Sequence, residues 1–374
     1  SQYVFQNVNA VLRPGEGTLL LGPSSSGKTT FMRTLGDVLS GISLESTEGT
    51  VTLGPSRWDP TACPSTLKRT VAYVDQSDLT LTPILTVEET VRFARSCAEE
   101  LDPEVLEESM EAIFKLAGLD HVRQTVVGNA DIRGVSGGQK RRVKMLEMAV
   151  GTDVTVLFLD EITNGLDAAS AFRICKVVKA ATITQNFSAI TCLLQPSDDV
   201  YRTFHRVILL TPDGQVAYSG KTEDAPAHFD GLGLKRPDEM NIPEYLLRCA
   251  SSPADLWDSE ENGDVPKALS SSSDLAGAFI NSPAGQVAVT ELENKGDGRA
   301  AESAFEQNGN APALKDFAQP TSKQIQLLIN RGWKLVKRNP ANLMRLVSAI
   351  LFGVFIGTLF LKTPNDEGGT QVRG

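Results

Sequence analysis

Short apolar runs recur along the first 220 residues of the chain, and each is followed by turn residues or by a segment with helical spacing. Runs of about five apolar residues without alternation are typical of strands buried on both faces of a parallel sheet. Segments with apolar residues three or four positions apart predict helices. We expect strands at 1–13, 17–21, 50–54, 71–76, 155–161, 189–194, 206–210 and 216–218, and helices at 28–41, 86–94 and 103–118.

Strands that alternate with helices predict an α/β fold, with a mostly parallel sheet covered by helices on both faces. We place this domain at residues 1–250 and assign about 86–150 to a helical subdomain within it. The subdomain begins at Thr86, because Glu89 follows three residues later and the two form a helix-capping pattern.

The pattern is lost between residues 251 and 320. This stretch holds twelve Asp and Glu against four Lys and Arg, and it contains four consecutive serines at 270–273. Acidic, serine-rich sequence without periodicity is typical of a solvated chain. We therefore predict a flexible acidic linker over 251–320.

Helical spacing returns at 322–338, and a run of sixteen residues without a charge follows at 346–361. A membrane-spanning helix needs about 20 apolar residues. Residues 321–345 hold six Lys and Arg and no acid, which is typical of a cytoplasmic flank. We predict an amphipathic connecting helix at 321–340, a first transmembrane helix at 341–362 and the start of an extracellular loop at 363–374. A buried core helix is the alternative for the apolar run.

The formal net charge of −10 argues against a nucleic-acid partner. The five cysteines are scattered along the chain, which favours reduced thiols on the cytosolic side of a membrane over a disulfide framework or a metal cluster. The chain begins as though inside a strand and stops soon after the apolar run, so we expect a fragment that is cut within a membrane domain.

A glycine-rich stretch joins the predicted strand at 17–21 to the next helix and fits the phosphate-loop pattern of Gly, four residues, Gly-Lys-Thr. Backbone N–H groups of such a loop and the helix N-terminus cradle phosphate oxygens. Lys28 is expected to reach the β- and γ-phosphates of ATP, and the Thr29 hydroxyl to ligate Mg²⁺. The expected nucleotide-binding residues are Gly22, Pro23, Ser24, Ser25, Ser26, Gly27, Lys28, Thr29 and Thr30.

The strand at 155–161 ends in two carboxylates. Asp160 is expected to hold Mg²⁺ opposite Thr29, and Glu161 to act as the general base for the attacking water. Gln76, at another strand end, is expected to contact the metal or the water and to sense the γ-phosphate.

A second candidate anion cradle is the stretch Ser136, Gly137, Gly138 and Gln139, at the start of a helix. One nucleotide does not need two cradles in one subunit. We therefore expect Ser136 to Gln139 to serve a nucleotide held by a facing partner domain.

These four residues resemble the signature of ATP-binding-cassette ATPases, in which two cassettes enclose two ATP molecules between one phosphate loop and the other signature. The resemblance covers residues 1 to about 230 and implies a phosphate-loop ATPase fold. It implies that Gln76 is the residue of the Q-loop, and that Asn164, Gly165, Leu166 and Asp167 form the D-loop.

A cassette followed by a linker and a membrane helix resembles the G subfamily, and Arg338-Asn339-Pro340 before the apolar run fits it. The resemblance implies an exporter of hydrophobic compounds or lipids in a membrane, with the plasma membrane expected, a cytoplasmic cassette and a second cassette as partner. Most cassettes carry a γ-phosphate-contacting His where Leu194 stands, and first cassettes of pleiotropic-drug-resistance transporters often depart there. We therefore expect the amino-terminal half of such a transporter, with slow hydrolysis at its own site.

Three alternatives remain open at this point: a white-type half transporter, a soluble cassette ATPase that acts on ribosomes or DNA, and a regulatory module without turnover. The aromatic residue that stacks on adenine is either Tyr3 or upstream of the chain. The transported substrate is not predicted.

Overall fold

The computed structural model describes residues 4–6, 8–39, 71–75, 81–98, 100–149, 154–257, 266, 269, 271–293 and 319–360. Its centre is a six-stranded sheet with the strand order β2-β3-β4-β1-β5-β6. The α/β class predicted from the sequence is confirmed. The strands are β1 (Gly17–Leu21), β2 (Val71–Val74), β3 (Val156–Asp160), β4 (Ser188–Cys192), β5 (Arg206–Leu210) and β6 (Val216–Lys221).

The first five strands across the sheet run parallel, and β6 pairs antiparallel with β5 at one edge. Strands β1, β3, β4 and β5 are buried at every residue, as expected of parallel strands that are covered on both faces. Parallel strands end at the same edge of a sheet. The residues that follow β1, β2, β3 and β4 therefore meet along one edge.

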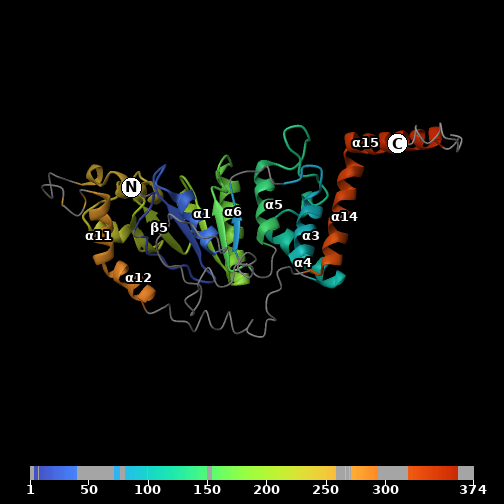
Figure 1. Cartoon of the computed structure of the whole chain (residues 1–374). Coiled ribbons are helices and arrows are strands. Elements are labelled where there is room, and N and C mark those ends of the chain that lie inside the picture. Colours follow the sequence, from blue (N-terminus) through green and yellow to red (C-terminus); the bar gives the residue numbers. More distant parts are fainter. Residues whose placement is uncertain are drawn as a thin grey trace, which may run out of the picture.

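Helices lie in the connections between the parallel strands, and a short turn joins β5 to β6 (Figure 1). Helix α1 packs on β2 and β3, α6 packs on β1 and β4, and α9 packs on β5. The helices of this part are α1 (Lys28–Leu39), α6 (Ala168–Gln185), α7 (Asp198–Tyr201), α8 (Ala225–Gly231), α9 (Ile242–Ser251) and the 3-10 turn η3 (Pro253–Leu256).

The strand expected at residues 1–13 is wrong for the described part of that range, which contains no strand. Strand β1 already pairs with β4 on one side and β5 on the other, so no edge of it is left for a preceding strand. The N-terminal residues contact a turn instead, where the Gln6 N–H donates to the Gly214 carbonyl at 3.2 Å. The strand expected at 50–54 lies outside the described residues.

A second, smaller core forms among α3 (Val87–Ala98), α4 (Pro103–Ala117), the 3-10 turn η2 (Asp120–Val122) and α5 (Gly137–Ala149). Phe114 and Met110 are fully buried in this helical cluster. Helix α5 belongs to both cores, because Val143 and Leu146 pack in the helical cluster while Met145 packs against the sheet.

Part of the segment expected to be a flexible linker is folded. Helices α11 (Ser272–Asn281) and α12 (Pro283–Glu293) both pack on β6. Ser271 caps α11 by accepting the Asp274 N–H at 3.1 Å, and Phe279 is buried against Tyr218 with 5.7 Å between ring centroids. The average composition of residues 251–320 is acidic, so it does not reveal this short apolar face. Residues 294–318 lie outside the described residues.

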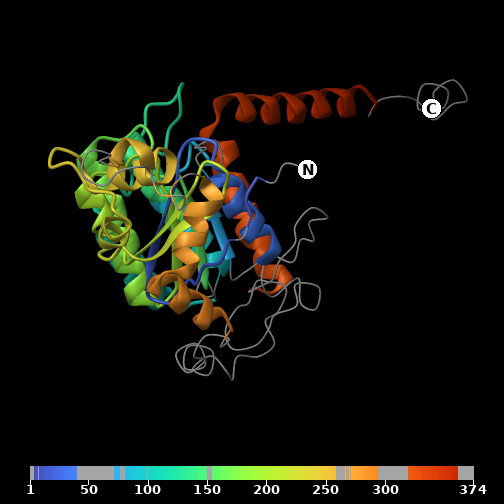
Figure 2. The same cartoon turned by 90° about the vertical axis from the view of Figure 1, so that its left-hand side faces the viewer.

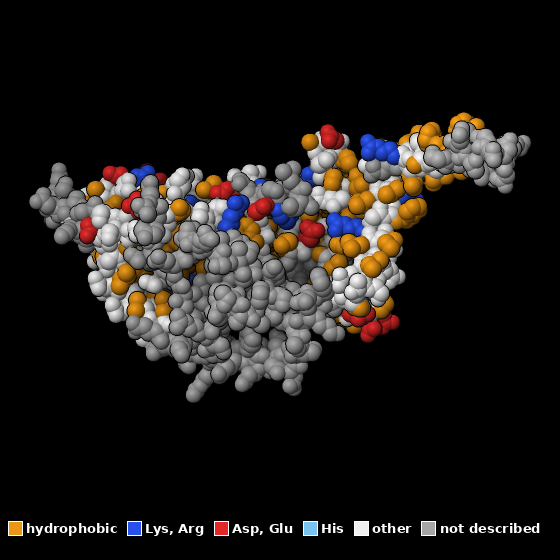
Figure 3. All heavy atoms as spheres, in the orientation of Figure 1, with side chains coloured by type: hydrophobic (Ala, Val, Ile, Leu, Met, Phe, Trp, Pro, Cys, Tyr) orange, Lys and Arg blue, Asp and Glu red, His pale blue; other side chains and the backbone are white. Residues whose placement is uncertain are grey.

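Near the C-terminus, α14 (Thr321–Arg338) lies along α3, and α15 (Pro340–Phe360) leaves the rest of the molecule in both side views (Figures 1 and 2). Apolar side chains cover much of the described surface of α15 (Figure 3). Within the described residues, no single helix meets the length and hydropathy expected of a membrane span. Taken together, Thr321–Arg338 and Leu343–Leu359 meet them as a pair bent by 93°.

The packing of α11 on β6 yields a stability prediction. Phe279→Ala removes a ring that is 2% exposed, so we expect the free energy of unfolding to fall by about 3–5 kcal/mol in urea titrations. Val287→Ala on the neighbouring α12 removes a side chain that is 58% exposed and serves as the control. Equal losses for the two variants would contradict the docked position of α11.

Candidate functional site

The phosphate-loop sequence connects β1 to α1 in a tight turn over residues 22–27. Ser25 and Gly27 have positive φ angles of 65° and 83°, and the Gly27 carbonyl accepts the first helical hydrogen bond from the Phe31 N–H at 2.7 Å. A Cβ added to Gly22 would lie 2.6 Å from the Ser26 Oγ and 3.1 Å from the Leu210 Cβ. A side chain at the first position of this loop would therefore crowd Ser26 and Leu210.

The loop curls around Lys28. The Lys28 amino group is buried and donates to the Gly22 carbonyl at 2.8 Å and to the Pro23 carbonyl at 2.6 Å. Burial lowers the pKa of Lys28, while nearby acidic groups, Glu161 and Asp160 among them, act in the opposite direction. The Ser26 Oγ is also buried and has no hydrogen-bond partner among the described residues. A buried cation and an unpaired buried hydroxyl in one small turn suit an anionic ligand.

Two side chains hold Asp160 at the end of β3. The Thr29 hydroxyl donates to the Asp160 Oδ1 at 3.3 Å, and the Tyr73 hydroxyl donates to the Asp160 Oδ2 at 3.0 Å. Burial and the charge of Asp160 raise the pKa of Tyr73, so the phenol keeps its proton. Sequence reasoning missed Tyr73. Its position near the end of β2, three residues before Gln76, places it close to the sheet edge that carries Asp160.

Glu161 has a φ angle of 49°, which is uncommon outside glycine and costs about 1–3 kcal/mol. Its N–H donates to the Cys192 carbonyl at 3.0 Å, and its carbonyl accepts the Asn164 N–H at 3.1 Å. These bonds hold the strained residue directly after Asp160. Strain of this kind concentrates at functional sites.

Two other expected site residues follow strands of the sheet. Gln76 lies outside the described residues. Leu194 is 40% exposed, two residues beyond the end of β4, which lies between β1 and β3. The structure describes all three histidines of the chain, and none of them lies at the end of β4 beside Leu194. His205 accepts the Gly17 N–H at the opposite end of β1, His228 lies in α8, and His121 lies in η2.

Ser136 and Gln139 close the N-terminus of α5 with a reciprocal cap. The Gln139 Oε1 accepts the Ser136 N–H at 2.8 Å, and the Ser136 Oγ accepts the Gln139 N–H at 3.3 Å. Ser136 is exposed and Gln139 is partly exposed, and the Gln139 amide is 3.2 Å from the His121 Nε2. A Cβ on Gly137 would meet nothing within 4 Å, so the start of α5 is open to an outside molecule.

The stretch expected to be the D-loop joins β3 to α6. Asp167 caps α6 by accepting the Ser170 N–H at 2.9 Å, and Gly165 has a φ of 74°. Gly138 lies close to this stretch, since a Cβ on it would be 3.6 Å from Leu166.

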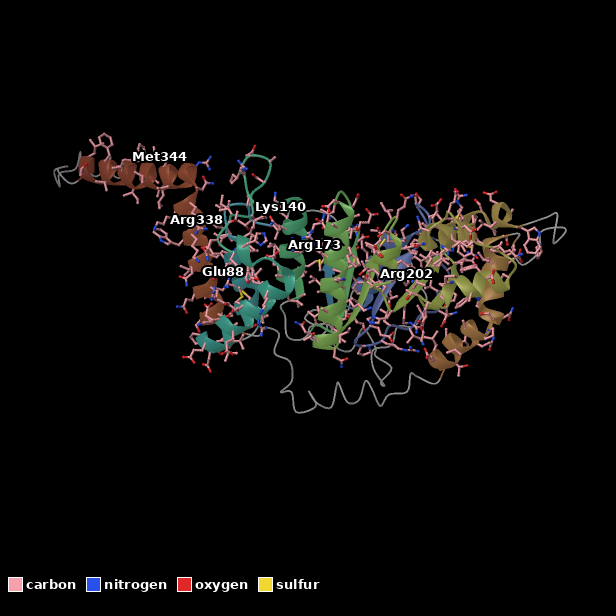
Figure 4. All side chains as sticks on the ribbon, turned by 180° about the vertical axis from the view of Figure 1, so that it is seen from behind. Glu88, Lys140, Arg173, Arg202, Arg338 and Met344 are labelled. Atoms are coloured by element: carbon pink, nitrogen blue, oxygen red, sulfur yellow. The ribbon has the colours of Figure 1, made fainter. Side chains whose placement is uncertain are left out.

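The structure does not bring the two expected anion cradles together. Among the described residues, no hydrogen bond or ion pair joins the phosphate loop to residues 136–139, and α5 lies on the far side of α6 from α1 (Figure 1). In the view from behind, Lys140, which follows Gln139, lies beside Arg173 of α6 (Figure 4).

Comparison with known proteins places this geometry in a family. Residues 5–164 match the family described as "ABC transporter", and residues 194–252 and 323–374 match two families described as "ABC-2 type transporter". The solved structure of cbiO1 from Clostridium perfringens, part of the ABC transporter complex cbiONQ, covers 61% of this chain and 86% of its own with a TM-score of 0.50. At 22% identity, that likeness supports the fold alone.

Longer relatives match nearly the whole chain. ABC transporter G family member 47 of Oryza sativa is 31% identical, with 96% of this chain and 26% of the relative covered. ABC transporter G family member 31 of Arabidopsis thaliana is 30% identical, and the match covers 96% of this chain and 27% of the relative. The pleiotropic drug resistance protein TUR2 of Spirodela polyrhiza is 29% identical, and the match covers 98% of this chain and 27% of the relative. The chain thus spans about a quarter of the length of these relatives.

The fold and the loop define a phosphate-loop nucleotide-binding domain of the cassette ATPase class. The chain belongs to the ATP-binding-cassette transporters of the G family. The family prediction made from the sequence is therefore confirmed.

The close approach at Gly22 provides a test of the loop. Gly22→Ala forces a Cβ against Ser26 and Leu210, so we expect binding of a fluorescent ATP analogue to weaken about tenfold or more, since overpacking costs about 1–3 kcal/mol. Gly36→Ala in α1 is the control, because its Cβ would meet Tyr73 at an ordinary 3.6 Å. Unchanged binding in the Gly22 variant would refute the loop geometry.

Proposed function

We propose that this chain binds ATP with Mg²⁺ at the loop of residues 22–30 and hydrolyses it to drive efflux of hydrophobic compounds or lipids through a membrane domain. The observation that carries the proposal is the contact between the Thr29 hydroxyl and the Asp160 carboxylate at 3.3 Å. A hydroxyl and a carboxylate beside a phosphate loop are the two protein ligands that Mg²⁺ takes in this class of site.

Each residue of the site has a distinct role in the proposal. Lys28 binds the β- and γ-phosphates and turns from its own loop carbonyls toward them. Thr29 and Asp160 would hold the metal, and Gln76, which lies outside the described residues, is proposed to contact the metal or the attacking water. Bound Mg²⁺ supplies charge stabilisation for the transferred phosphoryl group. Glu161, held by backbone bonds at the end of β3, accepts the proton of the attacking water.

The separation of the two cradles supports a second cassette as the partner. Residues 136–139 present an exposed, capped helix N-terminus, while the chain's own phosphate loop lies elsewhere in the fold. Two cassettes facing each other complete both sites, each with a phosphate loop from one and a signature from the other. Relatives about four times as long favour a full-length transporter over a white-type half transporter.

The site of this chain is proposed to hydrolyse slowly. Leu194 follows β4 at the sheet edge that carries Asp160 and Glu161, and its apolar side chain offers no hydrogen bond to a γ-phosphate. Loss of one such donor from a transition state costs about 10²–10³ in rate. The signature of this chain then completes the faster site, on the partner cassette.

Helix α14 is proposed to couple the cassette to the membrane. Glu89, in the first turn of α3, binds Arg338 with both carboxylate oxygens, and its carboxylate lies 3.1 Å from the Lys334 amino group. Figure 4 labels Arg338 and Glu88, the residue before Glu89. The Arg331 guanidinium packs over the Phe93 ring at 4.4 Å.

The opposite face of α14 exposes Ile325, Leu328 and Trp333, which suits a membrane surface or a membrane domain. Helix α15 is then the first membrane helix.

The Glu89 contacts set a pH range for this docking. Burial raises the pKa of Glu89, but the Thr86 N–H, Arg338 and Lys334 lower it more, to about 2. A carboxyl whose folded pKa lies below its ordinary 4.5 stabilises the fold above that pH, and the contribution is lost as the pH falls from about 4.5 to 2. The docking of α14 therefore keeps its full strength at neutral pH.

The proposed inequality of the two sites is tested with two variants in the assembled transporter. We expect Glu161→Gln to leave most of the steady ATP turnover, because the partner site carries it. Ser136→Arg, which places a bulky cation at the signature, is expected to reduce turnover about 10²-fold or more. Phosphate release from proteoliposomes measures both. A complete stop after Glu161→Gln would contradict the slow site.

The coupling role of α14 is tested with Glu89→Gln. Removal of the charge breaks the ion pairs to Arg338 and Lys334, so we expect transport per ATP hydrolysed to fall while ATP binding persists. Glu104→Gln, on the exposed surface of α4, serves as the matched control. The ratio of substrate efflux to phosphate release is the measurement, and an unchanged ratio would refute this role.

A further inference from the structure

Lys144 occupies the junction of the two cores. Its neighbours Val143 and Met145 pack in the helical cluster and against the sheet, respectively, so the lysine stem emerges between them. The Lys144 side chain is only 7% exposed. A buried ammonium group requires a partner, because leaving it unpaired in the interior is strongly unfavourable.

The partner is the residue that follows β2. The Lys144 amino group donates to the Asp75 Oδ1 at 2.9 Å and to the Asp75 main-chain carbonyl at 3.5 Å. One cation thus holds both the side chain and the backbone of Asp75. Helix α5 is thereby fastened to the chain immediately before Gln76.

The same strand is also fastened to the candidate metal site. Tyr73 of β2 donates to the Asp160 Oδ2 at 3.0 Å, and β2 pairs with β3 in the register that puts Val74 opposite Leu159. Three consecutive residues, 73–75, therefore connect Asp160 at one end with α5 at the other. The start of α5 carries Ser136 and Gln139, which cap each other there.

We propose that the Lys144–Asp75 ion pair is a positioning contact that fixes the signature at the start of α5 relative to Asp160, and so couples the two nucleotide sites that one cassette serves. The inference rests on the proposed function, since it needs a nucleotide at each cradle. Neither residue touches a nucleotide: both act through the placement of α5. Misplacement of a binding group by about 1 Å can cost about 10²-fold in rate.

The test compares binding at one site with turnover at the other in the assembled transporter. Lys144→Met removes the charge and keeps an apolar stem of similar length. We expect ATP binding at this chain's own loop to stay within about twofold, and hydrolysis at the partner site to fall about tenfold or more. Lys115→Met, an exposed lysine on α4, is the matched control and is expected to change neither.

A charge exchange separates positioning from a general loss of stability. The double variant Asp75→Lys with Lys144→Asp restores the opposite-charge pair, and we expect it to recover partner-site hydrolysis to within about threefold of the parent. If Lys144→Met does not fold, Asp75→Ala decides, since the Asp75 side chain is 39% exposed and its removal takes away the side-chain acceptor of the Lys144 hydrogen bond. Normal turnover in a folded Lys144→Met or Asp75→Ala variant overturns the proposal, as does a folded charge exchange without recovery.

The outcomes also distinguish this proposal from the one on which it rests. If Lys28→Ala leaves ATP binding unchanged, the proposed function itself fails. If ATP binding requires Lys28 and partner-site hydrolysis requires Ser136, but Lys144→Met behaves as the parent, only the positioning role fails.

Discussion

The meeting of Thr29 with Asp160 is the contact on which the candidate site depends. It exists because β1 and β3 run parallel on either side of β4, so that the loop after one strand and the carboxylate at the end of the other reach the same sheet edge. Tyr73 adds a third strand to the arrangement from β2. A sheet with any of these strands reversed would separate the groups by the length of a strand.

Helix α5 connects that edge with the remainder of the molecule. Its first turn offers an open, capped N-terminus, its middle spans both cores, and Lys144 ties it to the end of β2. The helical cluster in turn carries α14 through Glu89 on α3. A continuous set of packed elements thus leads from the phosphate loop to the helix that precedes α15.

The differences between expectation and structure have local causes. Residues 272–293 fall within the predicted flexible linker because their surroundings are acidic and rich in serine, yet Leu275, Ala276 and Phe279 supply one buried face. Average composition does not detect an amphipathic helix of ten residues. The expected first strand failed for another reason, since β1 has no free edge to pair with. The role of Tyr73 is not visible in the sequence, because it depends on Asp160, which lies 87 residues further along the chain.

The sequence by itself determined the α/β class, the phosphate loop and the family. Short apolar runs, a glycine-rich turn and motifs in a fixed order are local patterns, so they can be recognised without knowledge of tertiary contacts. It also placed Asp160 and Glu161 at a strand end, and Ser136 to Gln139 at a helix start. Only the tertiary structure decided which of these groups meet. The Thr29–Asp160 and Tyr73–Asp160 bonds, the pairing of Lys144 with Asp75 and the docking of α14 on Glu89 all join residues far apart in the chain. Such contacts follow from strand order and helix packing, which no stretch of sequence encodes alone.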